Sequence, residues 1–356
     1  MPAWSIAILA CHAAPAALAG DASWRYRGDN LARALAQAGH EVVCAPLAAC
    51  PARRFDLVLL VRPLDGWGLR RRLAAWRRAG TRVLADVDDL VFEPALAPES
   101  PGVRHGRVSE AAVRERFERH RRALRQVDAL SVSTAALARA WQAQAPAGQP
   151  LMRLPNAVHL GWQGLPDTPW PTRHPAIAYF SGTRSHDHDL ALAAPGLAEA
   201  LRAAPHWRLR LVGPVAPPPG ITPGQLECVP RQPFLNGYAD AVRASQLALM
   251  PLAPGRFNGC KSALKVLEAH WWNVPVLASP LEDAERLQGP GLCSVASADG
   301  WAGALRQAMA VHDRQAGPPD LRAALGPEAD VRTWARRWQD WVEAELAPTA
   351  RGLGRC

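Results

Sequence analysis

Short apolar runs alternate with segments of helical periodicity along almost the whole chain, and this alternation limits the possible folds more than any other feature. In the first half, the apolar runs are Ser5–Cys11, Glu41–Ala45, Leu57–Val61, Arg82–Asp86 and Ala129–Ser133. The segments with apolar residues at helical spacing are Arg27–Ala38, Leu69–Ala79 and Glu110–Val127. Strands that alternate with helices form parallel sheets covered on both faces, so the pattern predicts a doubly wound α/β protein.

The alternation is interrupted once, by the Pro-rich stretch "QGLPDTPWPTRH" (Gln163–His174), which is typical of a linker between domains. It restarts with the segments "AIAYFSG", "RLRLVG", "LECV", "LALMPL", "VPVLAS" and "GLCSVA". A chain of 356 residues is long enough for two cores. We therefore predict two tandem Rossmann-like domains, residues 1–165 and 170–327, that face a central cleft. Ligands of such folds bind beyond the carboxyl ends of the strands, so the cleft is the predicted site.

A last helix is predicted over residues 328–348, where Trp334, Trp338 and Trp341 recur at spacings of four and three. Three tryptophans on one stripe are typical of a packing face. We expect this helix to pack back on the first domain, with its arginines directed toward water or lipid head groups.

The formal charge of +9 favours anionic partners such as nucleotides, phosphates or anionic lipid. The clusters Arg70–Arg72 and Arg119–Arg125 are interpreted as solvated helix faces. Nucleic acid is not an expected partner, because the sequence has no recognition motif and no platform of interleaved aromatic and basic residues.

Seven scattered cysteines without a C-x-x-C pair argue against a disulfide framework and a zinc site, and fit a reducing cytosol. The apolar N-terminal stretch has no basic residue before Arg25 and is broken by His12 and Pro15, so it is interpreted as a buried strand and a loop rather than a secretion signal. No uninterrupted apolar stretch reaches membrane-spanning length, so we expect a cytoplasmic protein whose contact with the inner face of a membrane would be peripheral.

Only two of the 41 basic residues are lysines, Lys261 and Lys265, and they lie four positions apart. A helix beginning near Cys260 would place Lys261, Lys265 and Glu268 on one face. Its N-terminus would lie at the ligand-binding edge of the second sheet, where free N–H groups and two ammonium groups favour a diphosphate. The alternative is an exposed helix face with an ordinary Lys–Glu pair.

The stretch from Lys261 to Ser279 resembles the donor-site motif of GT-B glycosyltransferases, the large and mostly retaining group 1 family that builds bacterial polysaccharides. The matching positions of its "K-S-x-x-K-x-x-E" and "P-V-[IV]-A-S" patterns are Lys261, Ser262, Lys265, Glu268, Pro275, Val276 and Ser279. The resemblance implies that Glu268 holds the nucleotide ribose, while Lys261 or Lys265 faces the donor phosphates or sugar. Asn258 and Ser262 are further expected donor-binding residues. Many members have a glutamate where this chain has Cys260, which leaves the sugar undetermined.

The stretch "AYFSGTRSHDHDL" resembles a second family segment, "Y-F-S-G-T-x-x-H-x-x-D". It implies that the amides of Gly182 and Thr183 approach the donor pyrophosphate and that Arg184 neutralises it. His186 and Asp189 are equally compatible with capping of the next helix. Further along, Phe234 is a candidate for stacking on the base. Tyr238 is interpreted as a core position of a helix.

In the first domain, "WRYRGDNLARALAQAGHEV" and "LADVDDLVFE" also resemble family segments. Arg25 and Arg27, in the loop after the first strand, and His12 are the expected acceptor-binding residues. Asp88 is read as a catalytic acceptor-side residue, and no essential metal is expected; a turn-forming Asp cluster is the alternative. His12 or Asp88 would supply the base if the reaction inverts configuration.

The function implied by the resemblance is transfer of a sugar from a nucleotide-diphosphate sugar to a hydroxyl group. A saccharide or lipid-linked saccharide in bacterial surface polysaccharide synthesis is the expected acceptor. Lys261 and Arg184 would stabilise the charge on the departing diphosphate. Two alternatives stay open at this point: a nucleotide-sugar epimerase on the same scaffold, and a non-catalytic nucleotide-sugar-binding partner subunit.

Overall fold

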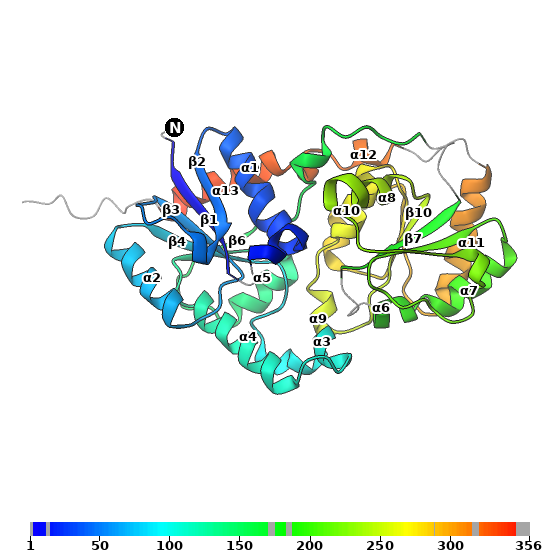
Figure 1. Ribbon diagram of the computed structural model, residues 1–356, viewed down its shortest axis with the longest axis horizontal. Helices are drawn as coiled ribbons and strands as arrows, with labels where there is room; N and C mark the ends of the chain where they lie inside the picture. Colours follow the sequence, from blue (N-terminus) through cyan, green and yellow to red (C-terminus); the bar gives the residue numbers. More distant parts are fainter. Residues whose placement is uncertain are drawn as a thin grey trace, which may run out of the picture. The chain divides into compact units, whose positions relative to one another are not determined.

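The computed structural model describes residues 3–11, 15–169, 175–182, 187–287, 289–314 and 320–346, and its backbone divides into two compact units (Figure 1). The first unit lies within Met1–Ala97, Ala111–Ala157 and Asp330–Cys356. The second unit lies within Pro98–Glu110 and Val158–Ala329. Each unit has its own six-stranded parallel sheet, so the predicted α/β class with two doubly wound domains is confirmed.

The sheet of the first unit has the strand order β2-β1-β3-β4-β5-β6. Its strands are β1 (Ser5–Ala10), β2 (Glu41–Pro46), β3 (Leu57–Val61), β4 (Arg82–Val87), β5 (Ala129–Val132) and β6 (Leu151–Arg153). All pairs are parallel, for example Ile6 beside Leu57 and Leu57 beside Arg82. Every residue of β3 is buried, as expected for a central strand whose two faces are both covered by helices.

Helices cover both faces of this sheet: α1 (Asn30–Gln37), α2 (Trp67–Arg78), α4 (Glu110–Leu124), α5 (Ala135–Gln142) and α13 (Val331–Leu346). The C-terminal helix α13 lies beside α1 (Figure 1), and Trp334 and Trp338 are buried on it. Arg332 Nε donates to Gln37 Oε1 at 3.1 Å, and Gln339 is bonded to His40. The helix predicted near residues 328–348 therefore belongs to the first unit.

The border between the units differs from the predicted one in two places. Val158–Leu165 belongs to the second unit, because Trp162 is fully buried in its core and Val158 N donates to Ala329 O at 2.8 Å. The segment Pro98–Glu110, which includes α3 (Pro101–Arg104), also belongs to the second unit. There Glu99 accepts a bond of 3.3 Å from the backbone N–H of Phe257. Both placements depend on contacts between residues distant in sequence.

The sheet of the second unit has the strand order β12-β11-β10-β7-β8-β9, and its pairs are also parallel. Its strands are β7 (Ala176–Phe180), β8 (Arg208–Val212), β9 (Leu226–Val229), β10 (Leu247–Met250), β11 (Val276–Ala278) and β12 (Leu292–Ser294). Counted from β7 within the unit, this order is 6-5-4-1-2-3, the arrangement of Rossmann-type folds.

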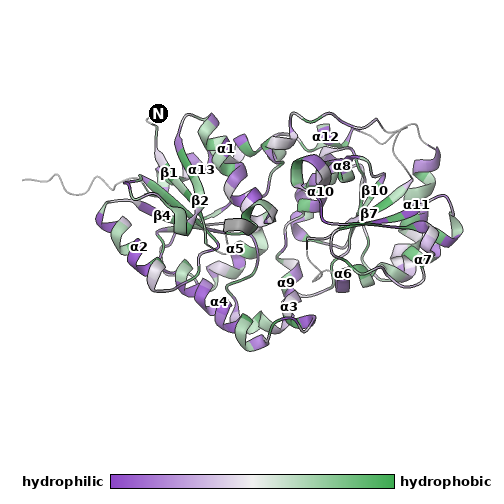
Figure 2. Ribbon diagram, in the orientation of Figure 1, coloured by the Kyte–Doolittle hydropathy of each residue, from purple (hydrophilic) through white to green (hydrophobic). Residues whose placement is uncertain are grey.

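Alternate residues of these strands supply two separate cores. On one face, Ala178 and Phe180 of β7 pack in the core that includes α10 (Leu264–Trp271). On the other face, Ile177 and Tyr179 pack in the core that includes α7 (Ala194–Ala203) and α11 (Gly300–Arg314). The α-helices of this unit after α3 are α6 (Asp187–Ala191), α7 (Ala194–Ala203), α8 (Ala239–Arg243), α9 (Arg256–Gly259), α10 (Leu264–Trp271), α11 (Gly300–Arg314) and α12 (Leu321–Ala324). Figure 2 shows the strands as hydrophobic and the outer sides of α2, α4 and α11 as hydrophilic. Within the described parts of the chain, no helix is both long and apolar enough to cross a lipid bilayer.

Candidate functional site

The reversal of strand order in the second sheet falls between β7 and β10, which are hydrogen-bonded neighbours. In open α/β sheets, ligands bind beyond the carboxyl ends of the strands at such a reversal. The segments at this position are Ser181-Gly182, which follows β7, and Pro251–Ala263, which follows β10. Both segments contain predicted donor-binding residues, so sequence and topology indicate the same edge of the sheet.

Lys261 and Lys265 do not share one helix, and the prediction of a helix beginning near Cys260 is wrong. The short helix α9 ends at Gly259, and α10 begins at Leu264. Ala263 leaves helical geometry with ψ 35°, and its N–H donates to Asp283 Oδ2 at 2.9 Å. The carboxylate of Asp283, twenty residues later in the sequence, thus stabilises the break between α9 and α10. Lys261 lies in the connection between these two helices.

A buried carboxylate, Asp189 of α6, organises the surroundings of Lys261. Asp189 Oδ1 accepts hydrogen bonds from the backbone N–H of Ala253 at 2.9 Å and from Asn258 Nδ2 at 3.0 Å. The other oxygen, Oδ2, lies 3.8 Å from Lys261 Nζ. The ammonium nitrogen is enclosed and has no hydrogen-bond partner among the described residues. Asp189 therefore joins the segments that follow β7 and β10, and within the described residues none of the three N–H donors of Lys261 is used in a hydrogen bond.

Lys265 and Glu268 form a second group through Tyr238. The Tyr238 hydroxyl lies 2.6 Å from Glu268 Oε2 and 2.8 Å from Lys265 Nζ, and Lys265 Nζ lies 3.6 Å from Glu268 Oε2. The side chain of Glu268 is 5% exposed, whereas that of Lys265 is 35% exposed. The interpretation of an ordinary exposed Lys–Glu pair is therefore wrong, because the carboxylate is buried and hydrogen-bonded.

Aromatic rings surround this second group. Tyr238 ends the π-helical segment Phe234–Tyr238, and its ring meets Phe180 edge to face at 5.3 Å. Phe234 stacks on Trp162, with 4.9 Å between ring centroids and 21° between ring planes. Trp162 is fully buried, so one face of Phe234 is committed to the core of the unit and at most the other face can receive a base.

The other predicted donor-binding residues are distributed around the same edge. Gly182 is exposed, with nothing within 4 Å of the position of a Cβ atom, and Ser262 lies half-buried between α9 and α10. Both amide protons of Asn258 are used, by Asp189 and by Ala253 O at 2.8 Å, so this side chain can offer a ligand only its oxygen. Thr183 and Arg184 lie outside the described residues, and so does His186.

One glycine is required by the packing of this edge. Gly213 follows β8 with φ 101°, and a Cβ atom there would lie 1.9 Å from the carbonyl oxygen of Ser181. Any side chain at this position would push the end of β7 away from β8. Gly213 therefore lets the backbone after β8 approach Ser181, the residue before Gly182.

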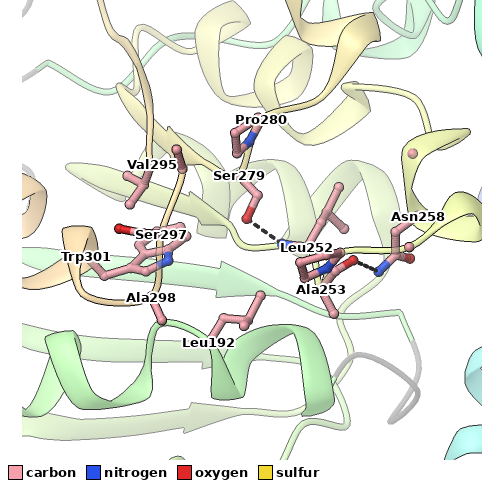
Figure 3. A pocket seen from close by; sticks show the side chains of 14 residues that line it. Leu192, Leu252, Ala253, Asn258, Ser279, Pro280, Val295, Ser297, Ala298 and Trp301 are labelled. Atoms are coloured by element: carbon pink, nitrogen blue, oxygen red, sulfur yellow. Dashed lines mark hydrogen bonds between the residues drawn. The ribbon is translucent and has the colours of Figure 1, made fainter.

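A cavity of about 270 Å³ lies beyond the carboxyl ends of β10, β11 and β12 (Figure 3). Its wall is mainly apolar, with polar groups from Asn258, Ser279 and Ser297. The Ser279 hydroxyl accepts from the backbone N–H of Leu252 at 2.9 Å, which fixes its position, as Figure 3 shows. The cavity is next to the Asp189–Lys261 group because Asn258 takes part in both.

In the first unit, Asp88 lies just after β4 and is paired with Arg62, which follows β3. Arg62 Nε lies 2.6 Å from Asp88 Oδ1, and Arg62 Nη2 lies 3.5 Å from Asp89 Oδ2. Arg62 has φ 51°, a left-handed conformation that is unusual for a non-glycine residue. Burial alone would raise the pKa of Asp88, but the charges of Arg62 and Arg27 and hydrogen bonds from Ser23 and Arg62 outweigh it and lower that pKa. Asp88 is thus held ionised, as a weak proton acceptor.

Arg27 is not available to bind an acceptor, and that prediction is wrong. Its side chain is 1% exposed and makes a two-bonded ion pair with Asp86, Nε to Oδ1 and Nη2 to Oδ2, both at 2.7 Å. Nη1 donates to Leu154 O at 2.6 Å and to Asn156 Oδ1 at 3.0 Å. Arg25 is half-buried and lies with Arg27 in the π-helical segment Trp24–Asp29 rather than in a loop. His12 lies outside the described residues.

Among the described residues, no group of three or more His, Cys, Asp or Glu side chains is arranged to hold a metal ion. The acidic residues in and just after β4 are instead committed to arginines, Asp86 to Arg27 and Asp88 to Arg62. Each carboxylate is therefore neutralised by a guanidinium group of the chain itself.

Three residues of these groups were not assigned their roles from the sequence. Arg62 had no motif around it, although an Arg directly after a buried strand is a usable signal. Asp189 matches the last position of the second family segment and is equally compatible with a helix cap, so its link to Lys261 is not predicted, and Tyr238 is interpreted as a core position. Their polar partners lie 26 to 72 positions away in the sequence, and only the fold brings them together.

Two Rossmann-like units of this kind, each with a parallel six-stranded sheet, define the GT-B fold of glycosyltransferases, and the chain has this fold. A scan against models of protein families finds no match, and a search of curated proteins finds no similar sequence. The resemblance is therefore one of structure.

Three solved structures show the similarity. A glycosyltransferase from Rickettsia africae superposes with a TM-score of 0.63 and 9% identity, covering 97% of this chain and 98% of that chain. Sucrose-phosphate synthase from Thermosynechococcus elongatus gives 0.60 and 14%, covering 96% and 99%. Anabaena HepE, in complex with UDP and glucose, gives 0.59 and 12%, covering 96% and 100%. The fold predicted from the sequence is thus confirmed over almost the full length.

Proposed function

We propose that this chain is a glycosyltransferase that moves a sugar from a nucleotide-diphosphate sugar to a hydroxyl group of a saccharide or lipid-linked saccharide. The observation that carries the proposal is the enclosed ammonium group of Lys261, which follows β10, lies 3.8 Å from Asp189 and has no hydrogen-bond partner among the described residues, together with the buried carboxylate group of Glu268 on α10. A nucleoside diphosphate carries both groups that such a site recognises, an anionic diphosphate and a ribose diol. Solved structures with the same fold include complexes with UDP and UDP-glucose, which supports this ligand class.

In the proposed reaction, the bond between the sugar C1 and the diphosphate oxygen breaks, and a bond from C1 to the acceptor oxygen forms. The acceptor hydroxyl gives its proton to the departing phosphate oxygen if configuration is retained, or to a base of the first unit if it is inverted. The electron pair of the broken bond, with its negative charge, leaves with the nucleoside diphosphate. Lys261 would stabilise that charge, because its ammonium is fixed beside Asp189 before the ligand binds and needs no rearrangement. Arg184 is proposed to assist from the segment after β7.

Glu268 is proposed to accept hydrogen bonds from the ribose diol, with Lys265 directed toward the donor phosphates or sugar. Gly182, Thr183, Asn258 and Ser262 would complete the donor site. On the first unit, Arg25, His12 and Asp88 remain the proposed acceptor-side residues, with Asp88 acting as a hydrogen-bonding group because its pKa is lowered. The charge on the leaving group would be balanced by the chain's own cations, so we propose turnover without an added metal.

The test is a donor panel. The purified chain is incubated with UDP-, GDP-, dTDP- and ADP-sugars, with and without a mixture of saccharide and lipid-linked saccharide acceptors, and the released nucleoside diphosphate and glycosylated product are measured. We expect diphosphate release from one donor that depends on the acceptor, persists in EDTA and is lost in Lys261→Met. A new nucleotide sugar formed without acceptor would identify an epimerase instead. Nucleotide binding without turnover for any donor would contradict the proposal.

A further inference from the structure

The net charge of the chain belongs entirely to the first unit. Within the ranges of that unit the sequence has twenty-five arginines against sixteen acidic residues, whereas the second unit has sixteen basic and sixteen acidic residues. The formal charge of +9 is therefore the charge of the first unit alone. Its largest excess on one described helix is on α2, which contains five arginines and no Asp or Glu.

Helix α2 has one buried side, formed by Leu69, Leu73 and Trp76. Exposed residues at the spacing of the opposite side form a stripe that we call the outer face of α2: Trp67, Arg71, Ala74, Ala75 and Arg78. Figure 2 shows this outer side as hydrophilic. The outer face nevertheless contains a large ring at its N-terminal end.

Trp67 is 76% exposed, whereas the other tryptophans of the described residues are buried or half-buried. The guanidinium carbon of Arg71 lies 5.4 Å from the centre of the Trp67 ring. Water therefore covers most of an indole group, and transfer of its apolar surface into a less polar medium would be favourable. An exposed ring of this kind is a candidate contact with a partner.

The charges of the outer face are not balanced by the chain. Among the described residues, no carboxylate pairs with Arg71 or Arg78. The buried carboxylate of Asp65, at the start of this region, is already paired with Arg70 at 2.5 Å and Arg122 at 3.2 Å. Two guanidinium groups beside an exposed indole are thus available to an anionic partner.

The other basic helix of this unit, α4, is different. Its arginines alternate with glutamates and pair with them, as Arg122 does with Glu115 at 3.0 Å and Arg121 with Glu118. Ion pairs within one helix are typical of a face that only contacts water. The interpretation as a solvated helix face is therefore kept for α4 and set aside for α2.

We propose that the outer face of α2 is a docking surface for a membrane that contains anionic lipids. Guanidinium groups bind phosphates through paired hydrogen bonds, and Trp is the side chain typical of the level of lipid head groups. Ala74 and Ala75 add little height between the arginines, so α2, about 18 Å long, can lie flat on a bilayer. Nucleic acid fits less well, because the single ring lies at one end of the stripe instead of being interleaved with the arginines.

The experiment measures how much of the full chain sediments with vesicles, and it needs neither donor nor acceptor, so its result is independent of the proposed function. Vesicles of equal parts phosphatidylglycerol and phosphatidylcholine are compared with vesicles of phosphatidylcholine alone. The wild-type chain is expected to partition at least about twentyfold more strongly onto the anionic vesicles in about 0.1 M NaCl.

The arginines are tested by the double variant Arg71→Gln/Arg78→Gln. Its partition onto anionic vesicles is expected to fall about twentyfold, about fivefold for each arginine near the surface. The matched control is Arg202→Gln/Arg208→Gln, which removes the same charge from exposed positions of the second unit and should stay within about twofold of wild type. Melting temperatures of all variants check the fold.

The ring is tested by Trp67→Ser. Its partition onto anionic vesicles is expected to be about tenfold weaker than that of wild type, and this factor should persist in about 0.5 M NaCl, where the contribution of the arginines is screened. Lipids brominated in their acyl chains should quench the fluorescence of the wild-type chain more than that of Trp67→Ser.

Four outcomes would overturn the proposal. Equal partition of the wild-type chain onto the two kinds of vesicle would exclude recognition of anionic lipid. A double variant that matches its control would show that the outer face of α2 is not the surface involved. Duplex DNA bound at the same salt without vesicle binding would identify a nucleic-acid surface. A dimer that becomes a monomer in Trp67→Ser, measured by light scattering, would identify a contact between two copies of the chain.

Discussion

Arg27 and Asp86 form a two-bonded ion pair that is closed off from water, with side-chain exposures of 1% and 0%. Arg27 lies in the segment after β1 and Asp86 lies in β4, so the pair joins two parts of the chain 59 positions apart. The same guanidinium group also bonds to Leu154 O and Asn156 Oδ1, just before the chain passes to the second unit. This pair holds the first unit together and has no group left for a ligand.

Replacement of Arg27 by Met is expected to destabilise the first unit by about 3–5 kcal/mol, because Asp86 would be left buried without its counter-charge. The measurement is urea unfolding followed by tryptophan fluorescence. Arg33→Met is the control, since Arg33 pairs with Asp29 at an exposed position, with its side chain 54% exposed, and should cost less than about 1 kcal/mol. Equal losses of unfolding free energy in the two variants would show that burial of the Arg27–Asp86 pair does not increase its contribution to stability.

A second prediction concerns the stability of the chain in acid and depends on His270 of α10. His270 is 2% exposed, and burial lowers its pKa to about 4, although a backbone hydrogen bond at Gly291 opposes the shift. In the unfolded chain the pKa is near 6.5, so between these two values only the unfolded state takes up the proton. The stability that the neutral ring provides is thus complete above about pH 6.5 and is lost as the pH falls toward 4.

The expected loss from this residue between pH 7 and pH 5 is about 2 kcal/mol. His270→Gln should remove that part of the pH dependence, as measured by urea unfolding at the two pH values. His206, whose side chain is 58% exposed beside Asp313, serves as the control, and His206→Gln should keep the wild-type slope. A wild-type slope in His270→Gln would mean that the ring is protonated in the folded chain.

The order of strands and helices could be predicted from the sequence because local burial determines it. Leu57–Val61 is apolar throughout and is buried throughout, and the six apolar segments of the second half all became strands. The prediction of the border between the two units was less accurate. Trp162 lies in a stretch that looks like the start of a linker, and only the shape of the second core shows that the ring belongs there.

In the candidate site too, the residues of local motifs could be predicted from the sequence, whereas the long-range contacts could not. Lys261, Lys265 and Glu268 were found because lysine is rare in this chain and because the motif is local. The break between α9 and α10 was missed, since it depends on Asp283, twenty positions later. Tyr238 has the spacing of a core residue, and its polar role depends on Glu268, thirty positions later. Pattern identifies residues that share a motif, whereas long-range hydrogen bonds are set by the fold.

Lys265→Arg is expected to impair turnover although it preserves the charge. Lys265 Nζ lies 2.8 Å from the Tyr238 hydroxyl and 5.9 Å from the centre of the Phe180 ring. A planar guanidinium is larger and cannot reproduce that single short bond without displacing the ring. We expect kcat/KM to fall at least about tenfold, about 1.4 kcal/mol, in steady-state assays. Arg306→Lys, at a surface pair with Glu199, should retain the wild-type rate. A wild-type rate in Lys265→Arg would show that charge alone is sufficient.

The final prediction separates the two members of the Asp189–Lys261 pair by the sign of their effects. In Asp189→Asn, the amide oxygen can still accept from Ala253 N and Asn258 Nδ2, so the local backbone is retained. The negative charge 3.8 Å from Lys261 Nζ is lost, and the enclosed ammonium is left uncompensated. Without ligand, this variant should be less stable than wild type by about 1–3 kcal/mol.

A diphosphate can replace the missing charge, so the nucleoside diphosphate should raise the melting temperature of Asp189→Asn by more than it raises that of wild type. Lys261→Met should show the opposite, a smaller rise than wild type. Asp187→Asn, on the same helix and bonded to Ala216 N, should match wild type in this comparison. If Asp189→Asn and Lys261→Met both reduced the rise, Asp189 would be needed to place the lysine rather than to balance its charge, and the charge-balance account of this pair would be wrong.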